Sequence, residues 1–328
     1  VAPDTTWQTP TGPIRSSDLQ MGETYDARRE LTGWDQPGFD ATAWKPVTIM
    51  PAYAGKLETH PGVPVRTTQE LAPIAITEPK PSVFIFNMGQ NFAGCVRLTS
   101  SGPAGTKITL RHGEMLHNDG TLMTENLRKA RAVDTYILKG EGTETWTPRF
   151  TFHGFQYVEV TGFPGTPALD AIRGLVVHSD TPRVGQFACD NAMIDQLYSN
   201  IDWTQRANFI DLPTDCPQRD ERLGWMGDAQ IYVRSAACNR DVAAFYTKWL
   251  VDVEDAQYPS GEFTDFAPEP YKQETPSPAW MDAGVICPYT MFMVYGDTRL
   301  VERHWDSMVR YMDFLEKNTK NGLRCHIK

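Results

Sequence analysis

The chain has 328 residues, more than the roughly 100–200 residues of one domain, so we expect at least two domains rather than a single small binding module. Hydrophobic residues make up 41% and charged residues 22%, which is typical of globular proteins and excludes a disordered or fibrous chain. The net charge of −10 repels phosphate backbones and anionic bilayers, so we expect neither nucleic acid nor a membrane as a partner.

The first residues and the cysteines carry no targeting or metal signal. The chain starts at Val1 without a Met, a basic stretch or an apolar run, so we expect that residue 1 is not the biological start, and the compartment stays open. No run reaches the roughly 18 apolar residues of a membrane span. Because the cysteines show neither CxxC nor zinc-ligand spacing, we expect free buried thiols, no metal and no cofactor. They are Cys95, Cys189, Cys216, Cys238, Cys287 and Cys325.

The first half of the chain has the pattern of β-structure. Residues 1–66 are rich in Gly and Pro, which predicts short strands and loops. Between residues 83 and 179, runs of β-branched and aromatic residues alternate with Gly, Pro and Asn, which predicts an antiparallel β-sandwich. The expected strands are Val83–Phe86, Lys107–Arg111, Thr135–Leu138, Tyr157–Val160 and Leu175–Val177.

The hydrophobic period changes from two to 3.6 after residue 187, which predicts helices. Asp190 is a suitable N-cap for the first, and we expect about five helices, the last ending near Lys317. Trp249 and Trp305 lie on apolar stripes and are expected in the core. Short connections indicate antiparallel hairpins, and therefore an all-α bundle, solenoid or toroid.

One segment between two expected helices, residues 211–228, carries five acids and two arginines within 18 residues. Its two prolines and two glycines preclude a continuous helix, so a rigid loop would carry the carboxylates. Neighbouring carboxylates raise one another's pKa and a guanidinium lowers it, so such a cluster can hold one acid protonated at neutral pH. General acid catalysis is the functional interpretation.

Two other interpretations of this segment stay open on spacing alone. Arg219 and Arg222 can simply pair with the acids in a solvated loop, which is the usual fate of mixed charges. A calcium site is a further option, although the alternation of oxygen ligands typical of an EF-hand is absent. Trp225 and Trp280 favour a sugar site, because an aromatic ring beside carboxylates suits the apolar face and the hydroxyls of a sugar.

Residues 208–230, from Asn208 to Gln230, closely resemble the signature of bacterial α-L-rhamnosidases of glycoside hydrolase family 78. Other segments resemble that family in its order, so that the resemblance covers essentially the whole chain. They are Gly22–Arg28, Gly33–Asp40, Met88–Gly94, Leu110–Leu116 with Glu114, Phe150–Gly162 and Ser277–Asp282.

The resemblance implies a multidomain β-then-α fold, with β-sandwich domains followed by the first part of a six-hairpin (α/α) barrel. Residues 1–75 would form part of an upstream β-sandwich domain and linker, residues 76–185 a β-sandwich domain, and residues 186–328 the N-terminal part of the catalytic barrel. Five helices are less than half of such a barrel. We therefore expect bare apolar inner faces that favour self-association, and one alternative is that another chain or copy covers Phe245, Trp249 and Trp305.

The resemblance also implies hydrolysis of terminal α-L-rhamnosides with inversion, by two carboxyls about 6.5–9.5 Å apart. Glu221 matches the general acid, and we expect its pKa to be raised by the surrounding acids. The family's general base, a Glu on a later hairpin, has no match before Lys328, so this chain alone is expected to be inactive or nearly so. The matching sugar-contacting positions are Asp215, Arg219, Trp225, Asp228, Trp280 and Asp282.

The expected partners are rhamnose-containing glycosides or polysaccharides. A glycan-binding protein without catalysis and a phosphorolytic enzyme on the same barrel are the alternatives. His153 is interpreted as a partly buried histidine that joins the β-domain to the barrel, and Gln90 and Asn91 as turn or interface residues. The loop with Glu262, Asp265 and Glu269 either borders the pocket or faces solvent.

Overall fold

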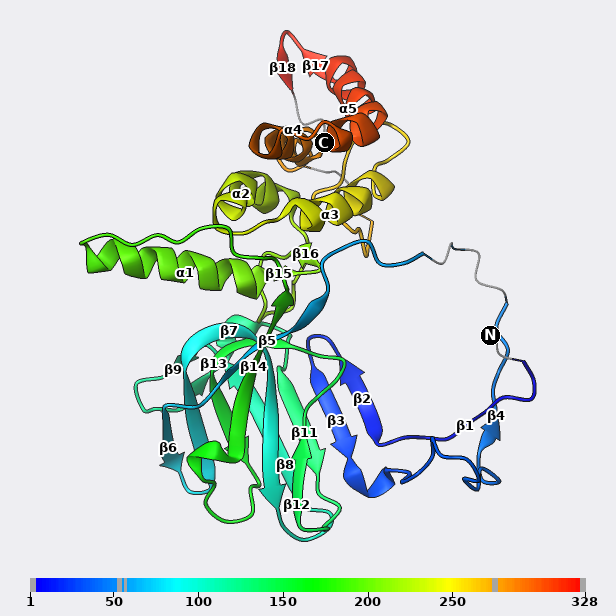
Figure 1. Cartoon of the computed structure of the whole chain (residues 1–328), viewed down its shortest axis with the longest axis vertical. Helices are drawn as coiled ribbons and strands as arrows, with labels where there is room; N and C mark the ends of the chain where they lie inside the picture. Colours follow the sequence, from blue (N-terminus) through cyan, green and yellow to red (C-terminus); the bar gives the residue numbers. More distant parts are fainter. Residues whose placement is uncertain (1–3, 52–54, 56–57, 273–276, 325–328) are drawn as a thin grey trace.

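The computed structural model describes residues 4–51, 55, 58–272 and 277–324. A β-rich first part is followed by a helical second part, which confirms the predicted order (Figure 1). The expected strand runs are confirmed too, since each lies wholly or largely within a longer strand. Outside the main sheet lie four short pairs: β1 (Gln8–Thr9) with β4 (Lys45–Pro46), β9 (Met115–Leu116) with β10 (Leu122–Met123), β15 (Phe209–Ile210) with β16 (Leu212–Pro213), and β17 (Thr319–Lys320) with β18 (Leu323–Arg324).

The β-rich part is built on one ten-stranded sheet that curls around its core (Figure 1). Its order is β2-β3-β11-β8-β13-β7-β14-β5, and β6 and β12 also pair with β7. All pairs are antiparallel except β3 with β11. The strands are β2 (Ile14–Asp18), β3 (Gly22–Asp26), β5 (Val65–Leu71), β6 (Ala75–Lys80), β7 (Val83–Ser101), β8 (Lys107–Gly113), β11 (Val133–Ile137), β12 (Thr143–Trp146), β13 (His153–Thr161) and β14 (Ile172–Ser179).

The long strand β7 holds the sheet together, because it pairs with β13 along its first part and with β14 along its second. The change occurs at Gly94, whose Cα partners are His153 and Val176. A Cβ at Gly94 would lie 1.9 Å from the carbonyl oxygen of Leu175, so only glycine fits there. The core on the concave side includes Phe86, Val96, Leu98, Ile108, Phe155 and Val158.

Strands from the first 75 residues belong to this same sheet. β3 pairs with β11, and β5 pairs with β14 at the other end of the strand order. The sheet therefore combines segments on both sides of residue 75, and the division at residues 75 and 185 stays a prediction.

Five α-helices follow, as predicted, and α5 ends at Lys317. The N-cap of the first is Asn191 rather than Asp190: the Asn191 side chain accepts a hydrogen bond from Met193 N at 3.0 Å. In the described part of the chain, no helix is long and apolar enough to cross a membrane. The helices are α1 (Ala192–Asn208), α2 (Met226–Asn239), α3 (Ala243–Asp255), α4 (Ala283–Tyr295) and α5 (Arg299–Lys317).

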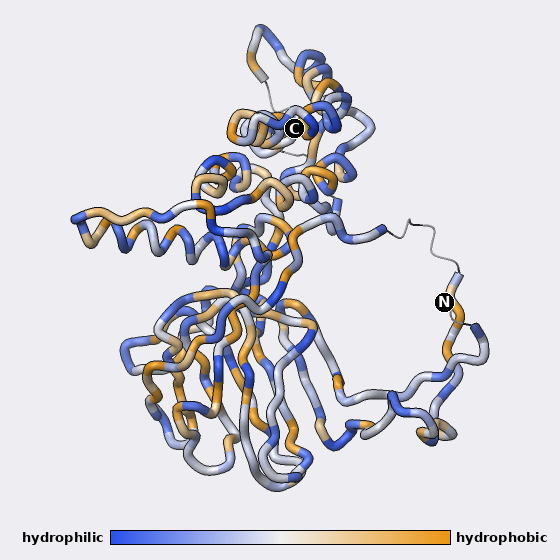
Figure 2. The backbone as a smooth tube through the Cα atoms, viewed as in Figure 1, coloured by the Kyte–Doolittle hydropathy of each residue, from blue (hydrophilic) through white to orange (hydrophobic). Residues whose placement is uncertain are grey.

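The helical core confirms one expectation about aromatic side chains and corrects another. Trp249 is buried, which confirms its expected place in the core, and Phe245 is buried too, so this chain itself covers both side chains. The reason is that α3 packs against α4 and α5 and that the Trp249 indole donates to the Ala267 carbonyl at 2.9 Å. Trp305 is 58% exposed and not in the core, because the buried side of α5 runs through His304, Met308 and Tyr311. Apolar and polar residues also alternate along the projecting helix α1 (Figure 2).

The cysteines depart in part from the expected buried thiols. Cys95, Cys216 and Cys287 are free and buried, whereas Cys189 and Cys238 are free and exposed. Cys325 lies outside the described residues.

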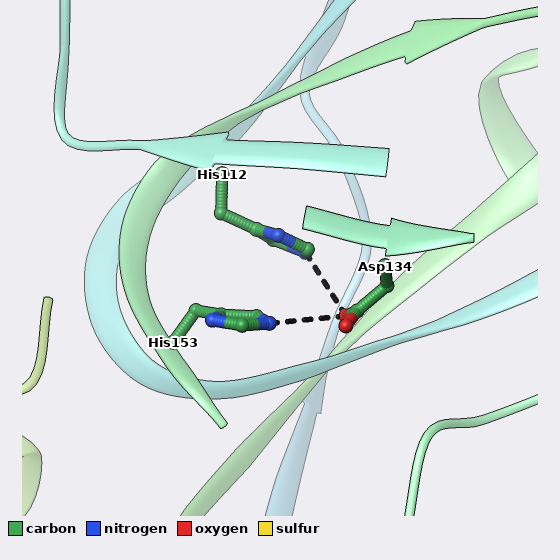
Figure 3. Close-up of side chains that lie close together, drawn as sticks. All are labelled: His112, Asp134 and His153. Atoms are coloured by element: carbon green, nitrogen blue, oxygen red, sulfur yellow. Dashed lines mark hydrogen bonds and ion pairs between the residues drawn. The ribbon is translucent and has the colours of Figure 1, made fainter. Parts of the chain in front are cut away.

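Two buried histidines share one carboxylate on three adjacent strands (Figure 3). His153 Nε2 donates to Asp134 Oδ2 at 3.1 Å, and His112 Nδ1 donates to the Ala132 carbonyl at 2.9 Å. His112 Nε2 has no hydrogen-bond partner among the described residues and lies 3.9 Å from Asp134 Oδ2. His153 is thus fully buried rather than partly buried as expected, and its neighbours Phe152 and Gly154 contact the segment between α1 and α2.

We predict that His112 makes the protein sensitive to acid. Burial, and then the neighbouring His153, lowers the pKa of His112 from 6.5 to about 3. Because the unfolded chain takes up this proton first, stability present above about pH 6.5 is lost as the pH falls toward 3, by up to about 1.4 kcal/mol per pH unit. In His112→Gln, urea midpoints measured across this range should fall less steeply. His117→Gln, at an exposed histidine, is the control, and equal slopes for wild type and His112→Gln would contradict the prediction.

We also predict self-association through an apolar face on α4 and α5. This face exposes Tyr289, Met293, Trp305 and Met312, each by more than half. Sedimentation velocity should detect dimers or larger species as the protein concentration rises, and Trp305→Glu should weaken them because it buries a charge in the contact. Trp34→Glu, at a comparably exposed tryptophan near the N-terminus, should not. A wild-type chain that stays monomeric at every concentration would refute this expectation.

Candidate active site

The acidic segment forms a tight loop between α1 and α2, as predicted. Asp215 closes it, because its main-chain N–H donates to the Leu223 carbonyl at 3.0 Å and its Oδ1 accepts from Leu223 N at 2.9 Å. Asp211 and Arg222 have positive φ angles of 66° and 59°, which no α-helix accommodates. The loop geometry therefore depends on main-chain bonds as well as on its prolines.

Arg219 joins the two carboxylates at the centre of the loop. Its NH2 donates to Asp215 Oδ2 at 2.9 Å and its Nε donates to Glu221 Oε2 at 2.7 Å. The indole of Trp225 donates to the other oxygen of Glu221 at 3.0 Å. These four residues form one hydrogen-bonded chain that is mostly shielded from solvent, unlike the solvated pairing considered above.

Arg222 pairs differently from the expectation that it would neutralise nearby acids. Its buried guanidinium donates to the main-chain carbonyls of Leu19 at 2.6 Å and Phe152 at 2.7 Å, both in the β-rich part of the chain. Further bonds reach the carbonyls of Gln218 and Arg219 within the loop. Arg222 thus attaches the loop to the β-rich part.

Arg128 is a site residue that the sequence interpretation missed. It follows the 3₁₀ turn η2 (Glu125–Leu127) with a φ of 56°, and its NH1 lies 3.0 Å from Glu221 Oε2 and 3.7 Å from Asp220 Oδ1. The adjacent main-chain N–H of Lys129 donates to Asp220 at 3.3 Å. No local sequence signal links Arg128 to a loop more than 90 residues away, since only the packing of two domains brings them together.

The pKa of Glu221 shifts in the direction opposite to expectation. Burial favours the neutral form of Glu221, but the hydrogen bond and charge of Arg219, the charge of Arg128 and the Trp225 bond outweigh it and lower the Glu221 pKa. The predicted raised pKa of Glu221 is therefore wrong for this chain. Burial instead raises the pKa of Asp215, despite its hydrogen bonds and the charge of Arg219.

Three of the predicted sugar-contacting residues line one open cavity of about 590 Å³: Asp215, Asp228 and Trp280. A Cβ at Gly227 would lie 2.8 Å from the Trp280 ring, so glycine allows the indole to approach α2. Arg219 lies beside Asp215 because the two are hydrogen-bonded, and Glu221 is hydrogen-bonded to Arg219 in turn. Trp225 packs edge-on against Phe266 at 5.0 Å between ring centroids.

Asp282 and the preceding loop with Glu262, Asp265 and Glu269 lie apart from the lining of this cavity. Asp282 Oδ1 accepts from the Tyr311 hydroxyl at 2.5 Å. Asp265 is buried and accepts from Ser277 N, and Glu269 accepts from the Tyr258 hydroxyl, both at 2.5 Å. These acids thus bind neighbouring loop and helix residues. The catalytic loop is the segment of residues 211–228, which carries the predicted general acid. Neither the cavity described above nor an adjoining cavity of about 360 Å³ beside this loop has Glu262, Asp265 or Glu269 in its wall.

Two groups of residues bring enough ligand atoms together to consider a metal. One is the cluster of His112, Asp134 and His153, and the other is Asp215, Cys216 and Glu221; in each, the ligand atoms lie within 4.8 Å of one another. In the second group Arg219 already binds both carboxylates, so a cation would have to displace a guanidinium. The chemistry that this arrangement offers is proton transfer and hydrogen bonding to a neutral ligand.

Comparisons with known proteins agree with this geometry. Three family models match in order: the α-L-rhamnosidase N-terminal domain at residues 1–69, the bacterial α-L-rhamnosidase concanavalin-like domain at residues 77–178, and the bacterial α-L-rhamnosidase six-hairpin glycosidase domain at residues 182–328. The α-L-rhamnosidase of Streptomyces avermitilis is 47% identical over 322 residues, which are 97% of this chain and 31% of that protein.

Solved structures give the same relationship. The α-L-rhamnosidase from Dictyoglumus thermophilum has a TM-score of 0.95 at 39% identity, over 98% of this chain and 36% of its own. The Streptomyces avermitilis α-L-rhamnosidase in complex with L-rhamnose has a TM-score of 0.92 at 46% identity, over 97% of this chain and 31% of its own. The chain thus spans about a third of the length of these relatives. With the β-rich part, the five helices and the catalytic loop all matched, the chain belongs to the bacterial α-L-rhamnosidase family.

Proposed function

We propose that this chain supplies the general-acid half of an α-L-rhamnosidase, which hydrolyses terminal α-L-rhamnosides with inversion. The observation that carries the proposal is the hydrogen-bonded set of Asp215, Arg219 and Glu221 beside a cavity lined by Asp228 and Trp280. Carboxylates and an indole at one cavity suit the hydroxyls and the apolar face of a sugar. The relatives named above are α-L-rhamnosidases, which supports rhamnose as that sugar.

Glu221 donates the proton to the glycosidic oxygen in this proposal. An acid with a lowered pKa must first gain that proton, and the surroundings of Glu221 suggest how. Burial is the largest single influence on its pKa and acts upward, while 19% of its side chain is still exposed. A sugar that covers this remaining surface raises the pKa further, because it removes water from the charged form.

Inversion also needs a carboxylate that activates water on the opposite face of the sugar. We propose that this base lies on a later hairpin of the barrel, because the relatives are about three times as long as this chain. We propose that Trp280 contacts the C5 methyl of rhamnose, since it is 38% exposed at the cavity whereas Trp225 is bound to Glu221 and packed on Phe266. Such a contact discriminates against a hydroxymethyl group by roughly 1–3 kcal/mol.

A rhamnoside hydrolysis assay tests the proposal on this chain beside a version extended to the length of the relatives. The extended enzyme should release L-rhamnose with inverted configuration, measured by proton NMR, and the 328-residue chain should release almost none. Glu221→Gln should lower turnover of natural rhamnosides by about 10²–10⁴-fold, because only the proton donor is lost. Asp255→Asn, at the exposed end of α3, is the control.

Four results would contradict parts of this proposal. Comparable rates from both lengths would place the base within residues 1–328, and near-normal turnover of Glu221→Gln would mean that another acid donates the proton. Binding of rhamnose without any turnover in the extended protein would favour a glycan-binding role, and a rate that depends on phosphate would indicate phosphorolysis.

We further predict that Arg128 lowers the pKa of Glu221 from outside the helical part. In Arg128→Gln one of two cations on this carboxylate is lost, so the ionised form is less favoured and the pKa of Glu221 should rise. A ¹³C NMR titration of the Glu221 carboxyl in the 328-residue chain measures this, with Glu221→Gln to assign the signal. Arg131→Gln, which leaves both guanidiniums on Glu221 in place, is the control. An unchanged or lower pKa in Arg128→Gln would contradict the prediction.

A further inference from the structure

The two main-chain carbonyls of the β-rich part that bind Arg222 lie in connections that no strand ladder joins. Leu19 lies between β2 and β3, and Phe152 directly precedes β13. In the strand order, β11 and β8 separate β3 from β13. Arg222 Nη1 nevertheless donates to both carbonyls, at 2.6 and 2.7 Å. Contacts other than strand pairing must therefore hold these two carbonyls close together.

Two buried carboxylates make these contacts. Asp134, on β11, accepts from Glu23 N on β3 at 2.9 Å and from His153 Nε2 on β13 at 3.1 Å (Figure 3). Glu23 Oε2 in turn accepts from the main-chain N–H groups of Arg149 and Phe150, just before β13, at 3.2 and 3.3 Å. The two carboxylates thus connect strands β3 and β13, which are not neighbours in the sheet.

The connection that contains Leu19 is held by the same part of the sheet. Thr151 Oγ1 donates at 3.2 Å to the Leu19 carbonyl, the oxygen that also accepts from Arg222. A Cβ at Gly22, whose φ is 101°, would lie 2.8 Å from Asp134 Oδ1, so glycine allows this turn to approach the carboxylate. The position of Leu19 therefore depends on Thr151 and on the close approach to Asp134.

This polar arrangement costs stability. Glu23, His112, Asp134 and His153 are all fully buried. Glu23 Oε1, His112 Nε2 and His153 Nδ1 have no hydrogen-bond partner among the described residues. Replacing buried charges by well-packed apolar side chains is often neutral or stabilising, and each unsatisfied polar atom adds a cost. These residues are therefore better suited to fixing a geometry than to stabilising the sheet.

We propose that Asp134 is a positioning residue for the general acid Glu221. It sets the spacing of the two carbonyls that Arg222 binds, and Arg222 directly follows Glu221 in the catalytic loop. The inference rests on the proposed function, because it concerns the acid which that function uses. Gln20, next to Leu19, reinforces the link, since its Nε2 donates to the Glu221 main-chain carbonyl at 3.4 Å. A change at Asp134 should therefore displace Glu221, although Asp134 lines neither cavity beside the catalytic loop.

In an extended enzyme, two substrates separate a displaced acid from a general loss of structure. Methyl α-L-rhamnoside needs a proton on its leaving oxygen, whereas the phenolate of 2,4-dinitrophenyl α-L-rhamnoside departs without one. Asp134→Asn should lower kcat for the methyl glycoside by about tenfold or more relative to the dinitrophenyl glycoside, because a misplaced donor transfers its proton poorly. KM should change alike for both. An equal loss of kcat for both substrates would overturn the proposal.

Two further variants separate positioning from stability. Glu144→Gln changes another buried carboxylate that accepts main-chain N–H bonds, on β12 at the end of the sheet away from the helices (Figure 1). It should lower the thermal midpoint and leave the ratio of the two kcat values unchanged. Thr151→Val removes the bond to Leu19 at nearly the same side-chain shape and should shift the ratio as Asp134→Asn does, by a smaller factor. If Asp134→Asn does not fold, an unchanged ratio in Thr151→Val would overturn the proposal.

Hydrogen exchange in the 328-residue chain tests the inference without any activity. Asp134→Asn should speed deuterium uptake at the main-chain N–H groups of Asp215 and Leu223, which close the catalytic loop, and Glu144→Gln should not. If the extended enzyme cleaves neither rhamnoside, the proposed function fails while this comparison still decides whether Asp134 positions the loop. Equal uptake in wild type and Asp134→Asn, or equal acceleration in both variants, would overturn the proposal.

Discussion

The buried charge of Arg222 fixes how the catalytic loop meets the β-rich part, and the candidate site depends on it. A guanidinium removed from water is costly unless its donors are satisfied, and here they reach the carbonyls of Leu19 and Phe152 across the junction and of Gln218 and Arg219 within the loop. A lysine could not make this set of bonds, because its single ammonium lacks the planar fork. The residue before it in the chain, Glu221, is thereby held against the β-rich part.

This attachment explains the charge balance of the site. Three acids, Asp215, Asp220 and Glu221, face two guanidiniums, that of Arg219 within the loop and that of Arg128 from the β-rich part. Burial alone would raise the pKa of Glu221, but Arg219 within the loop, followed by Arg128 from the β-rich part, outweighs it and lowers the pKa. In the proposed mechanism a bound sugar changes the surroundings of Glu221 before the proton is transferred, which couples protonation of the acid to occupancy of the cavity.

The same junction creates a cavity of about 360 Å³ beside the one lined by Asp228 and Trp280. It forms because the strand β7 and the loop after α1 approach each other without filling the space between them. The walls differ in character: on the β-rich side the amides are held by Glu114, and on the helical side the buried side-chain oxygens of Asn208 and Gln218 have no hydrogen-bond donor among the described residues. A surface that is rigid on one side and unsatisfied on the other is suited to a polar ligand. The β-rich part therefore contributes side chains to the candidate site in addition to supporting the helices.

The sequence by itself determined the local structure and the chemistry of the loop. Period-two and period-3.6 patterns predicted the strands and the five helices, and the Pro and Gly residues predicted the break that carries Asp215 and Glu221, since these signals depend on neighbouring residues only. Tertiary structure decided what distant residues do. Arg128 reaches Glu221, Trp305 faces solvent beside a buried His304, and Arg222 binds main-chain carbonyls instead of acids. These outcomes depend on which surfaces pack together, because burial and charge pairing are properties of neighbours in space and not along the chain.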